Sequence, residues 1–237
     1  TDNRESIDHT LSINDSSSPT QVTDSNVTTL NVSNPIQKAI NTAGDTGADS
    51  VEVRSGNYTE NVVANVSDLT VRANDTSAPP TLEPASTGSS TFNIAADNVT
   101  LSNFELTDSS SSVGVLVSDG ADVTVDNLES TGFGTALEIA PSSSVTNLLV
   151  NDSTLADSNV GIKFDNTSGS STAPIDATVQ FTDIENNSVA GVEIVPGTEV
   201  AGIAINNNNI VDNTVGIQND PSASLLPELD AQNNWWG

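Results

Sequence analysis

The chain lacks cysteine and methionine altogether, and it contains only five lysine and arginine residues. Without cysteine, disulfides and thiolate metal sites are excluded. With so few basic side chains, binding of nucleic acid through its phosphates is excluded as well. No segment approaches the ~20 consecutive apolar residues that a membrane-spanning helix needs. We therefore expect a protein that neither inserts into a membrane nor binds nucleic acid.

The shortage of positive charge leaves a large excess of acid, because 32 Asp and Glu residues give a formal charge of −27. Such a chain repels itself at low ionic strength, and salt screens the repulsion. High net charge is typical of disordered chains. However, 35% of the residues are hydrophobic, and they form short runs such as residues 115–117 and 203–205. We predict a folded, halophilic protein that needs no cofactor and binds Ca²⁺ or monovalent cations only loosely.

Ten Asn-X-Ser/Thr sequons are present, although the content of asparagine and hydroxyl residues alone predicts about seven. Each sequon permits N-glycosylation. Together with the acidity they favour an extracellular or cell-surface protein, and the start at Thr1 without a signal peptide predicts a processed chain. The candidate acceptors are Asn14, Asn26, Asn31, Asn57, Asn65, Asn74, Asn98, Asn151, Asn166 and Asn186.

Two regions differ in composition. Residues 1–33 form a polar leader with short β-prone segments at 21–23 and 27–30, which fits either a linker or a strand that pairs elsewhere. Residues 34–43 predict a helix, in which Asn34 caps the N-terminus and Pro35 takes the first position. A Gly-Asp-Thr-Gly turn at 44–47 then leads to a strand at 50–53.

The rest of the chain repeats. Strands that begin with a small residue occur at 114–117, 136–139, 161–164, 191–194 and 216–217, spaced by 22, 25, 30 and 25 residues. A second strand type lies between them, and Asn or Asp soon follows it. A period of roughly 20–30 residues with short strands is typical of a solenoid. Asn at a recurring corner tolerates left-handed backbone and can bond to an Asn stacked on the next coil. We predict an all-β fold, a right-handed parallel β-helix over residues 34–237 with a short N-terminal capping helix, because a β-sandwich explains neither feature.

Two segments resemble a known family. Residues 35–40 (PIQKAI), 45–47 (DTG), 51–53 (VEV) and 56–62 (GNYTENV) resemble the capping helix and first coil of the pectin-lyase-like right-handed β-helix superfamily. Residues 229–237 (LDAQNNWWG) resemble a last-coil signature of archaeal and bacterial β-helix surface proteins. The resemblance implies the fold over residues 34–237. It leaves function open, because this superfamily includes lyases, hydrolases, tailspikes, adhesins and structural proteins.

Catalytic residues are not apparent. The superfamily's lyases need a basic residue as proton acceptor, and only Lys163 lies in the middle of the repeats, where it alternates with Ile162 and Phe164 as an outward-facing residue would. Asp183 and Glu185 could form a carboxylate pair, but a chance pair is expected among 32 acids. The segment 119–122 and the pair Asp152 and Asp157 match no Ca²⁺ motif.

The sequence therefore predicts a non-catalytic extracellular surface or filament-forming structural protein that self-associates and carries N-glycans. The leader is a candidate linking strand between copies, and Trp235 and Trp236 are expected to cap the open end of the interior. The alternative is a carbohydrate-binding or carbohydrate-cleaving β-helix module, including a virus-type host-recognition spike.

Overall fold

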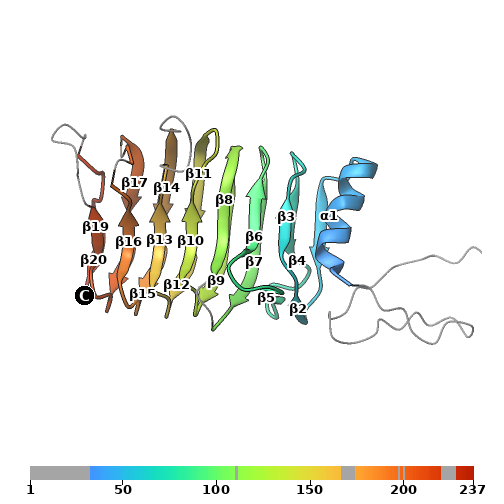
Figure 1. Ribbon diagram of the computed structural model, residues 1–237, viewed down its shortest axis with the longest axis horizontal. Coiled ribbons are helices and arrows are strands. Elements are labelled where there is room, and N and C mark those ends of the chain that lie inside the picture. The colour runs from blue at the N-terminus through green and yellow to red at the C-terminus, as the bar shows by residue number, and fades with distance from the viewer. Residues whose placement is uncertain (1–32, 110–111, 167–173, 197, 200, 220–227) are drawn as a thin grey trace, which may run out of the picture.

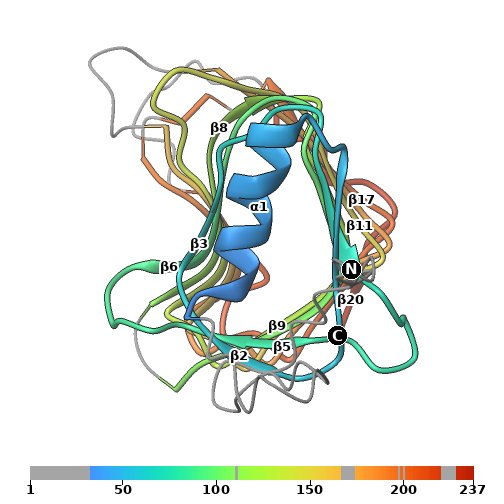
Figure 2. The ribbon, with the colours of Figure 1, turned by 90° about the vertical axis from the view of Figure 1, so that its right-hand side faces the viewer.

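The computed structural model describes residues 33–109, 112–166, 174–196, 198–199, 201–219 and 228–237. In these ranges the chain forms one helix and a stack of parallel strands, wound into a β-solenoid of about six turns (Figure 1). Figure 2 views the stack from its N-terminal end, and the chain runs clockwise as it recedes, so the solenoid is right-handed. The predicted parallel β-helix with a capping helix is confirmed.

The strands form three columns that run the length of the molecule (Figure 2). The first column contains β1 (Ser50–Val53), β4 (Thr70–Ala73), β7 (Thr100–Thr107), β9 (Thr124–Thr131), β11 (Val145–Asn151), β14 (Ile175–Gln180) and β17 (Gly202–Asn206). The second contains β2 (Asn57–Thr59), β5 (Thr81–Glu83), the second halves of β7 and β9, β12 (Thr154–Ala156), β15 (Asp183–Glu185), β18 (Asn209–Val211) and β20 (Trp235–Trp236). The third contains β3 (Val62–Ala64), β6 (Ser90–Ala95), β8 (Val113–Ala121), β10 (Thr135–Ile139), β13 (Val160–Phe164), β16 (Ala190–Ile194) and β19 (Ile217–Asn219).

A continuous apolar interior runs along the stack. Side chains alternate between the two faces of each strand, and the parallel register places equivalent residues directly above one another. In the first column, one such buried row is Val51, Val71, Leu101, Val125, Val150, Val179 and Ile205. Burial of each such side chain contributes about 1.5–3 kcal/mol. One coil alone exposes this row, so the coils are stable only as a stack.

The small residues that begin third-column strands have a packing reason. At Gly161, a Cβ would lie 2.6 Å from the carbonyl oxygen of Gly191 and 2.7 Å from Cγ2 of Ile184. At the start of the third-column strand, the backbone of one coil therefore packs directly against the backbone of the next coil. This close approach leaves no room for a side chain.

Left-handed backbone marks all three corners of the coil. Asn, Asp and Gly tolerate this conformation better than other residues. The corner between the first and second columns, here called the first corner, uses Asn103, Asn127, Asp152, Phe181, Asn207 and Asn233. The corner before the third column uses Gly132, Asp157, Asn186 and Asp212, and the corner that returns to the first column uses Asp68, Asn98, Asp122 and Asn147.

Stacked side chains link these corners between coils. Asn127 donates to Oδ1 of Asn103 at 2.7 Å, and this confirms the predicted asparagine stacking. At the first corner, the residue that follows the left-handed one points inward. It is apolar in the early coils, as with Leu128, and polar later, as with Asn208, whose amide donates to the carbonyl of Val179 at 2.9 Å.

The helix α1 (Pro35–Thr46) covers the N-terminal end of the interior (Figures 1 and 2). It ends three residues later than predicted, because Gly47 adopts left-handed backbone and terminates it. The predicted Asn34 cap is wrong, since the Asn34 side chain makes no capping hydrogen bond. Glu60 caps α1 instead: its two carboxylate oxygens accept from the backbone N–H groups of Ile36 and Gln37, both at 3.0 Å. The first coil therefore holds the helix in place.

Candidate functional site

A shallow acidic groove lies at the outer face of the second column. It has a volume of about 200 Å³ and lies over β7, β9 and β12. Glu105 and Glu129 are direct neighbours in the parallel register, and Asp152 lies one coil further at the first corner. Thr81 donates to Oε2 of Glu105 at 3.1 Å. Neighbouring strands lie about 4.8 Å apart, so the carboxylates of Glu105 and Glu129 are near enough to accept hydrogen bonds from the hydroxyls of one sugar.

The acidic pair expected from the sequence lies elsewhere. Asp183 and Glu185 flank the buried Ile184 on β15, so both side chains point outward from one strand. Neither lines the groove. Sequence reasoning missed Glu105 and Glu129, since 24 residues separate them and only the register brings them together.

The candidate cation ligands serve structural roles in the described part of the chain. Asp119 accepts from the backbone N–H of Ser144 at 3.1 Å, and Asp122 accepts from the stacked Asn147. Asp152 accepts from Asn151 at 2.6 Å, and Asp157 forms a left-handed corner. Over the described residues, no three His, Asp or Glu side chains converge as a metal site.

Lys163 lies on the outer face of the third column, as predicted, between the buried Ile162 and Phe164. Its Nζ atom donates to Oε1 of Glu138 at 2.9 Å and lies 3.5 Å from Oδ2 of Asp165. Burial lowers the pKa of the Lys163 ammonium, but the hydrogen bond to Glu138 and the surrounding carboxylates outweigh it and raise the pKa. A proton acceptor needs the opposite shift, so this lysine is held as a cation.

No protein-family model matches the chain, and no curated protein matches it. Among solved structures, the chain is similar to "Geobacillus virus E2 - ORF18". The TM-score is 0.52 and the identity is 13%, over 85% of this chain and 57% of that protein. The chain thus spans little more than half of that protein's length. This likeness shows a shared β-solenoid fold.

The sequons differ in accessibility. Asn57, Asn65, Asn74, Asn98 and Asn186 are exposed, although Asn98 donates to Asp68 at 2.8 Å. Asn151 is half-buried and bonds to Asp126, Asp152 and Gln180. Asn166 is only 1% exposed, which leaves no room for a glycan in this fold. Asn14, Asn26 and Asn31 lie outside the described residues.

The two tryptophans occupy different positions at the C-terminal end of the stack (Figure 1). Trp236 aligns with the buried Ile210, and a Cβ at Gly216 would lie 3.2 Å from its ring. Trp235 aligns with the outward-facing Asn209 and is 70% exposed. Trp236 therefore lies at the end of an interior row, whereas Trp235 continues an outer one.

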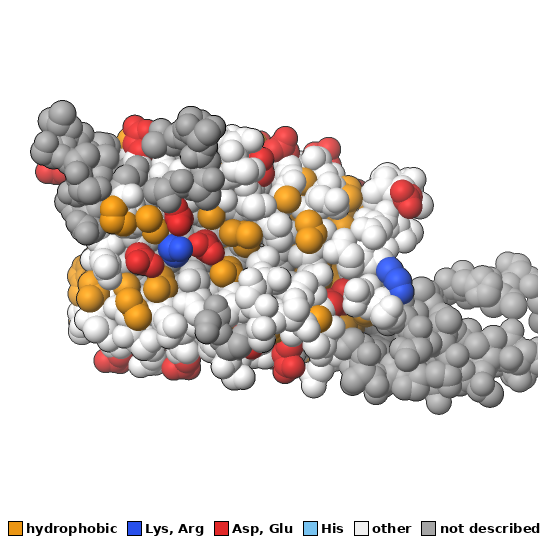
Figure 3. Space-filling model, viewed as in Figure 1, with side chains coloured by type: hydrophobic (Ala, Val, Ile, Leu, Met, Phe, Trp, Pro, Cys, Tyr) orange, Lys and Arg blue, Asp and Glu red, His pale blue; other side chains and the backbone are white. Residues whose placement is uncertain are grey.

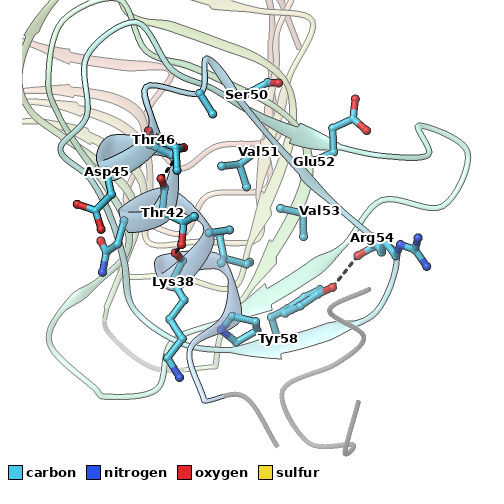
Figure 4. Close-up of a pocket in the computed structure, with 16 residues that line it drawn as sticks. Lys38, Thr42, Asp45, Thr46, Ser50, Val51, Glu52, Val53, Arg54 and Tyr58 are labelled. Carbon is cyan, nitrogen blue, oxygen red and sulfur yellow. Dashed lines mark hydrogen bonds between the residues drawn. The ribbon is translucent and has the colours of Figure 1, made fainter. Parts of the chain in front are cut away.

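A larger pocket of about 820 Å³ lies at the opposite end, between α1 and β1 (Figure 4). Apolar side chains of Ile36, Val51, Val53 and Tyr58 line it. The hydroxyl of Tyr58 donates to the carbonyl of Arg54 at 2.9 Å, which fixes the ring. In the part of the chain that the structure describes, α1 is the only helix, and at 12 residues it is too short to cross a membrane.

Proposed function

We propose that the chain is a non-catalytic structural rod of an extracellular surface, adapted to high salt and bearing N-glycans. The observation that carries this proposal is the unbroken parallel pairing of each coil with the next, from β1 to β20. Backbone ladders join each coil to the next, and stacked corner side chains such as Asn127 on Asn103 add further links. A rod of this kind resists bending. The superfamily resemblance and the viral neighbour are both compatible with a structural part of a cell or virus surface.

The surface chemistry supports the same proposal. Figure 3 shows acidic side chains scattered over the visible face and few basic ones among them. Lys163 is engaged by Glu138 and Asp165, and its pKa is raised, which argues against a role as a catalytic base. We propose Asn65 and Asn74 as the leading glycan acceptors, because both lie exposed outside the strands and, unlike Asn98 and Asn186, do not form left-handed corners.

Cryo-electron microscopy of the protein in molar salt, with mass spectrometry of the same sample, tests this function. We expect ordered polymers of stacked or laterally joined rods, with glycan mass on peptides that contain Asn65 or Asn74. Isolated monomers in molar salt would contradict a self-associating filament, and unmodified peptides would remove the glycans from the proposal.

The acidic groove favours one alternative, a carbohydrate-binding module. Its volume of about 200 Å³ is below the roughly 300–1,000 Å³ of most small-molecule sites, so we rank this alternative second. A glycan array in molar salt is the test. Binding that is lost in Glu105→Gln and Glu129→Gln, and retained in the matched outer-face variant Asp183→Asn, would establish it. Absence of binding across the array would remove it.

A further inference from the structure

The outer face of the first column carries little charge. It forms the side of the solenoid opposite the third column (Figure 2). Two rows of outward positions run along it from β7 to β17, on either side of the buried row of Leu101, Val125 and Val150. The first row is Thr100, Thr124, Leu149, Thr178 and Ala204, and the second is Ser102, Asp126, Asn151, Gln180 and Asn206. Asp126 is the only charged residue in these two rows, and Asp176 lies at their margin.

The other two columns present more charge on their strands. The third column has Glu138, Lys163 and Glu193 in one outward row. The second column has five acids and no base, which are Glu83, Glu105, Glu129, Asp183 and Glu185. Like charges placed opposite each other across an interface are costly. Two copies of a chain with a formal charge of −27 therefore approach with least repulsion through their first columns.

The side chains of the second row are fixed by hydrogen bonds between coils. Gln180 donates to Oδ1 of Asn151 at 3.1 Å, and Asn151 donates to Oδ1 of Asp126 at 2.9 Å. Side chains that are already ordered lose little entropy when a partner covers them. Amide and hydroxyl groups both donate and accept hydrogen bonds, so the same face of a second copy can pair with this one.

An exposed aromatic residue lies at the edge of this face. Phe181 directly follows Gln180, its side chain is 56% exposed, and its φ is 52°. The other described coils have Asn or Asp at this corner. Phenylalanine is enriched at protein interfaces, and strained backbone is retained at functional sites. Burial of the ring against a second copy would offset the strain that it causes within one copy.

The N-terminal end of the rod is less suited to a contact between copies. There α1 lies across the stack (Figures 1 and 2), and the Gln37 side chain pairs with the backbone of β3. Its Nε2 atom donates to the carbonyl of Val63 at 3.1 Å, and the Val63 N–H donates to its Oε1 atom at 2.6 Å. These two bonds occupy the groups that a strand of another copy would need. Contact through the sides of the rods is favoured instead.

We propose that the outer face of the first column, from β7 to β17, binds the same face of a second copy, with Phe181 as the apolar anchor at its edge. A face-to-face contact of this kind uses one surface on both partners. The proposal rests on the self-association proposed above and assigns one of its contacts.

Sedimentation velocity in molar sodium chloride, over a range of protein concentrations, tests the role of Phe181. We expect Phe181→Asn to raise the dissociation constant of the dimer at least about tenfold. Its unfolding free energy should not fall, because Asn adopts the corner backbone more readily. Val189, which is 44% exposed just before β16, provides the matched control, and Val189→Asn should leave the dissociation constant unchanged. An unchanged constant in Phe181→Asn, or equal losses in both variants, would overturn the proposal.

Cross-linking with a short bismaleimide identifies the face, and the cysteine-free sequence gives it no background. Thr178→Cys, Asp183→Cys and Glu193→Cys place one thiol on each column of the coil formed by β14, β15 and β16. We expect covalent dimers in molar salt from Thr178→Cys alone. Dimers from Asp183→Cys or Glu193→Cys without Thr178→Cys would overturn this contact and leave self-association standing. A monomeric unsubstituted protein in molar salt would overturn both.

Discussion

Phe181 differs from its neighbours at the first corner, where every other described position is Asn or Asp. Its φ is 52°, a left-handed backbone that costs a residue with a Cβ about 1–2 kcal/mol. The side chain is 56% exposed, so little burial offsets that cost. Strain of this kind persists where the surrounding coils impose the conformation.

Replacing Phe181 by Asn should therefore stabilise the protein by about 0.5–1 kcal/mol, because Asn adopts this backbone more readily. Denaturant unfolding in molar salt measures the change. The reverse change, Asn207→Phe, introduces the same strain one coil later and should destabilise by about 1 kcal/mol. A loss of stability in Phe181→Asn would show that the ring makes contacts that outweigh its strain.

Glu60 ties the capping helix to the first coil. Its side chain is fully buried, and burial raises the pKa of the Glu60 carboxyl above its ordinary value of 4.5, with the two backbone hydrogen bonds acting in the opposite direction. The native state therefore holds the proton more tightly than the unfolded chain does. The stability that this group contributes rises as pH falls through the native pKa, and it is fully present below the unfolded value.

Glu60→Ala should reduce the unfolding free energy by about 1–2 kcal/mol at neutral pH, because two helix N–H groups lose their acceptor. The difference in unfolding free energy between the unsubstituted protein and Glu60→Ala should increase as pH is lowered toward 5. Denaturant titrations at the two pH values measure it. The exposed Glu83→Ala on the next coil is the control and should show neither effect. A difference that narrows at lower pH would contradict the assigned direction of the pKa shift.

At the scale of elements, buried polar side chains replace apolar ones at the corners of the later coils. The Asn187 amide donates to the carbonyl of Leu155 at 3.1 Å and to Oδ1 of Asn213 at 2.9 Å, and its oxygen accepts from the Ser158 N–H at 3.1 Å. One side chain thus satisfies backbone groups of the preceding coil. Phe133 occupies the same corner position two coils earlier.

Asn187→Leu should destabilise the later coils by about 2–3 kcal/mol, because it leaves buried donors and acceptors unpaired. Thermal unfolding in molar salt measures the loss. Asn159 is exposed, and its side-chain oxygen accepts from the Ser188 hydroxyl. Asn159→Ala should change stability by less than about 0.5 kcal/mol. Equal effects of the two substitutions would argue against the buried ladder as a source of stability.

Lys163 separates two acidic residues on the third-column strands, since the register places it between Glu138 and Glu193. Its positive charge reduces the repulsion between them. Lys163→Glu would put carboxylates on three successive coils. We expect a loss of about 1–2 kcal/mol in 0.1 M salt, and a smaller loss in molar salt, where the charges are screened. Lys163→Gln, without the added charge, should show a weaker salt dependence. Unfolding curves at the two salt concentrations measure these losses of stability. A loss in Lys163→Glu that does not depend on salt would rule out charge repulsion as its cause.

At the scale of the molecule, the formal charge of −27 dominates. The screening length is about 10 Å in 0.1 M salt and about 3 Å in 1 M salt, so repulsion between coils weakens sharply over that range. We expect the thermal midpoint to rise steeply with sodium chloride from 0.01 to 2 M. Sucrose stabilises by exclusion from the surface without screening, and it should have a much smaller effect. A midpoint insensitive to salt would contradict the halophilic interpretation.

The sequence by itself determined the fold. A period of roughly 20–30 residues, alternating apolar positions and recurring small residues specify a parallel solenoid, because only stacked coils bury such rows. It also predicted the outward position of Lys163, since strand alternation is a local property. The capping helix was located, because Pro35 and the apolar positions after it are local signals as well.

Only the tertiary structure decided which residues meet between coils. The cap of α1 is Glu60 and not Asn34, although Glu60 lies 24 residues from Ile36 in the sequence. Glu105 and Glu129 share a groove while Asp183 and Glu185 do not. In the later coils the first corner falls at Phe181 and Asn207, and no local feature of the sequence marks Phe181 as a corner residue. Coil lengths vary along this chain, so the composition of each coil leaves its register against the next undefined, and that register fixes every one of these contacts.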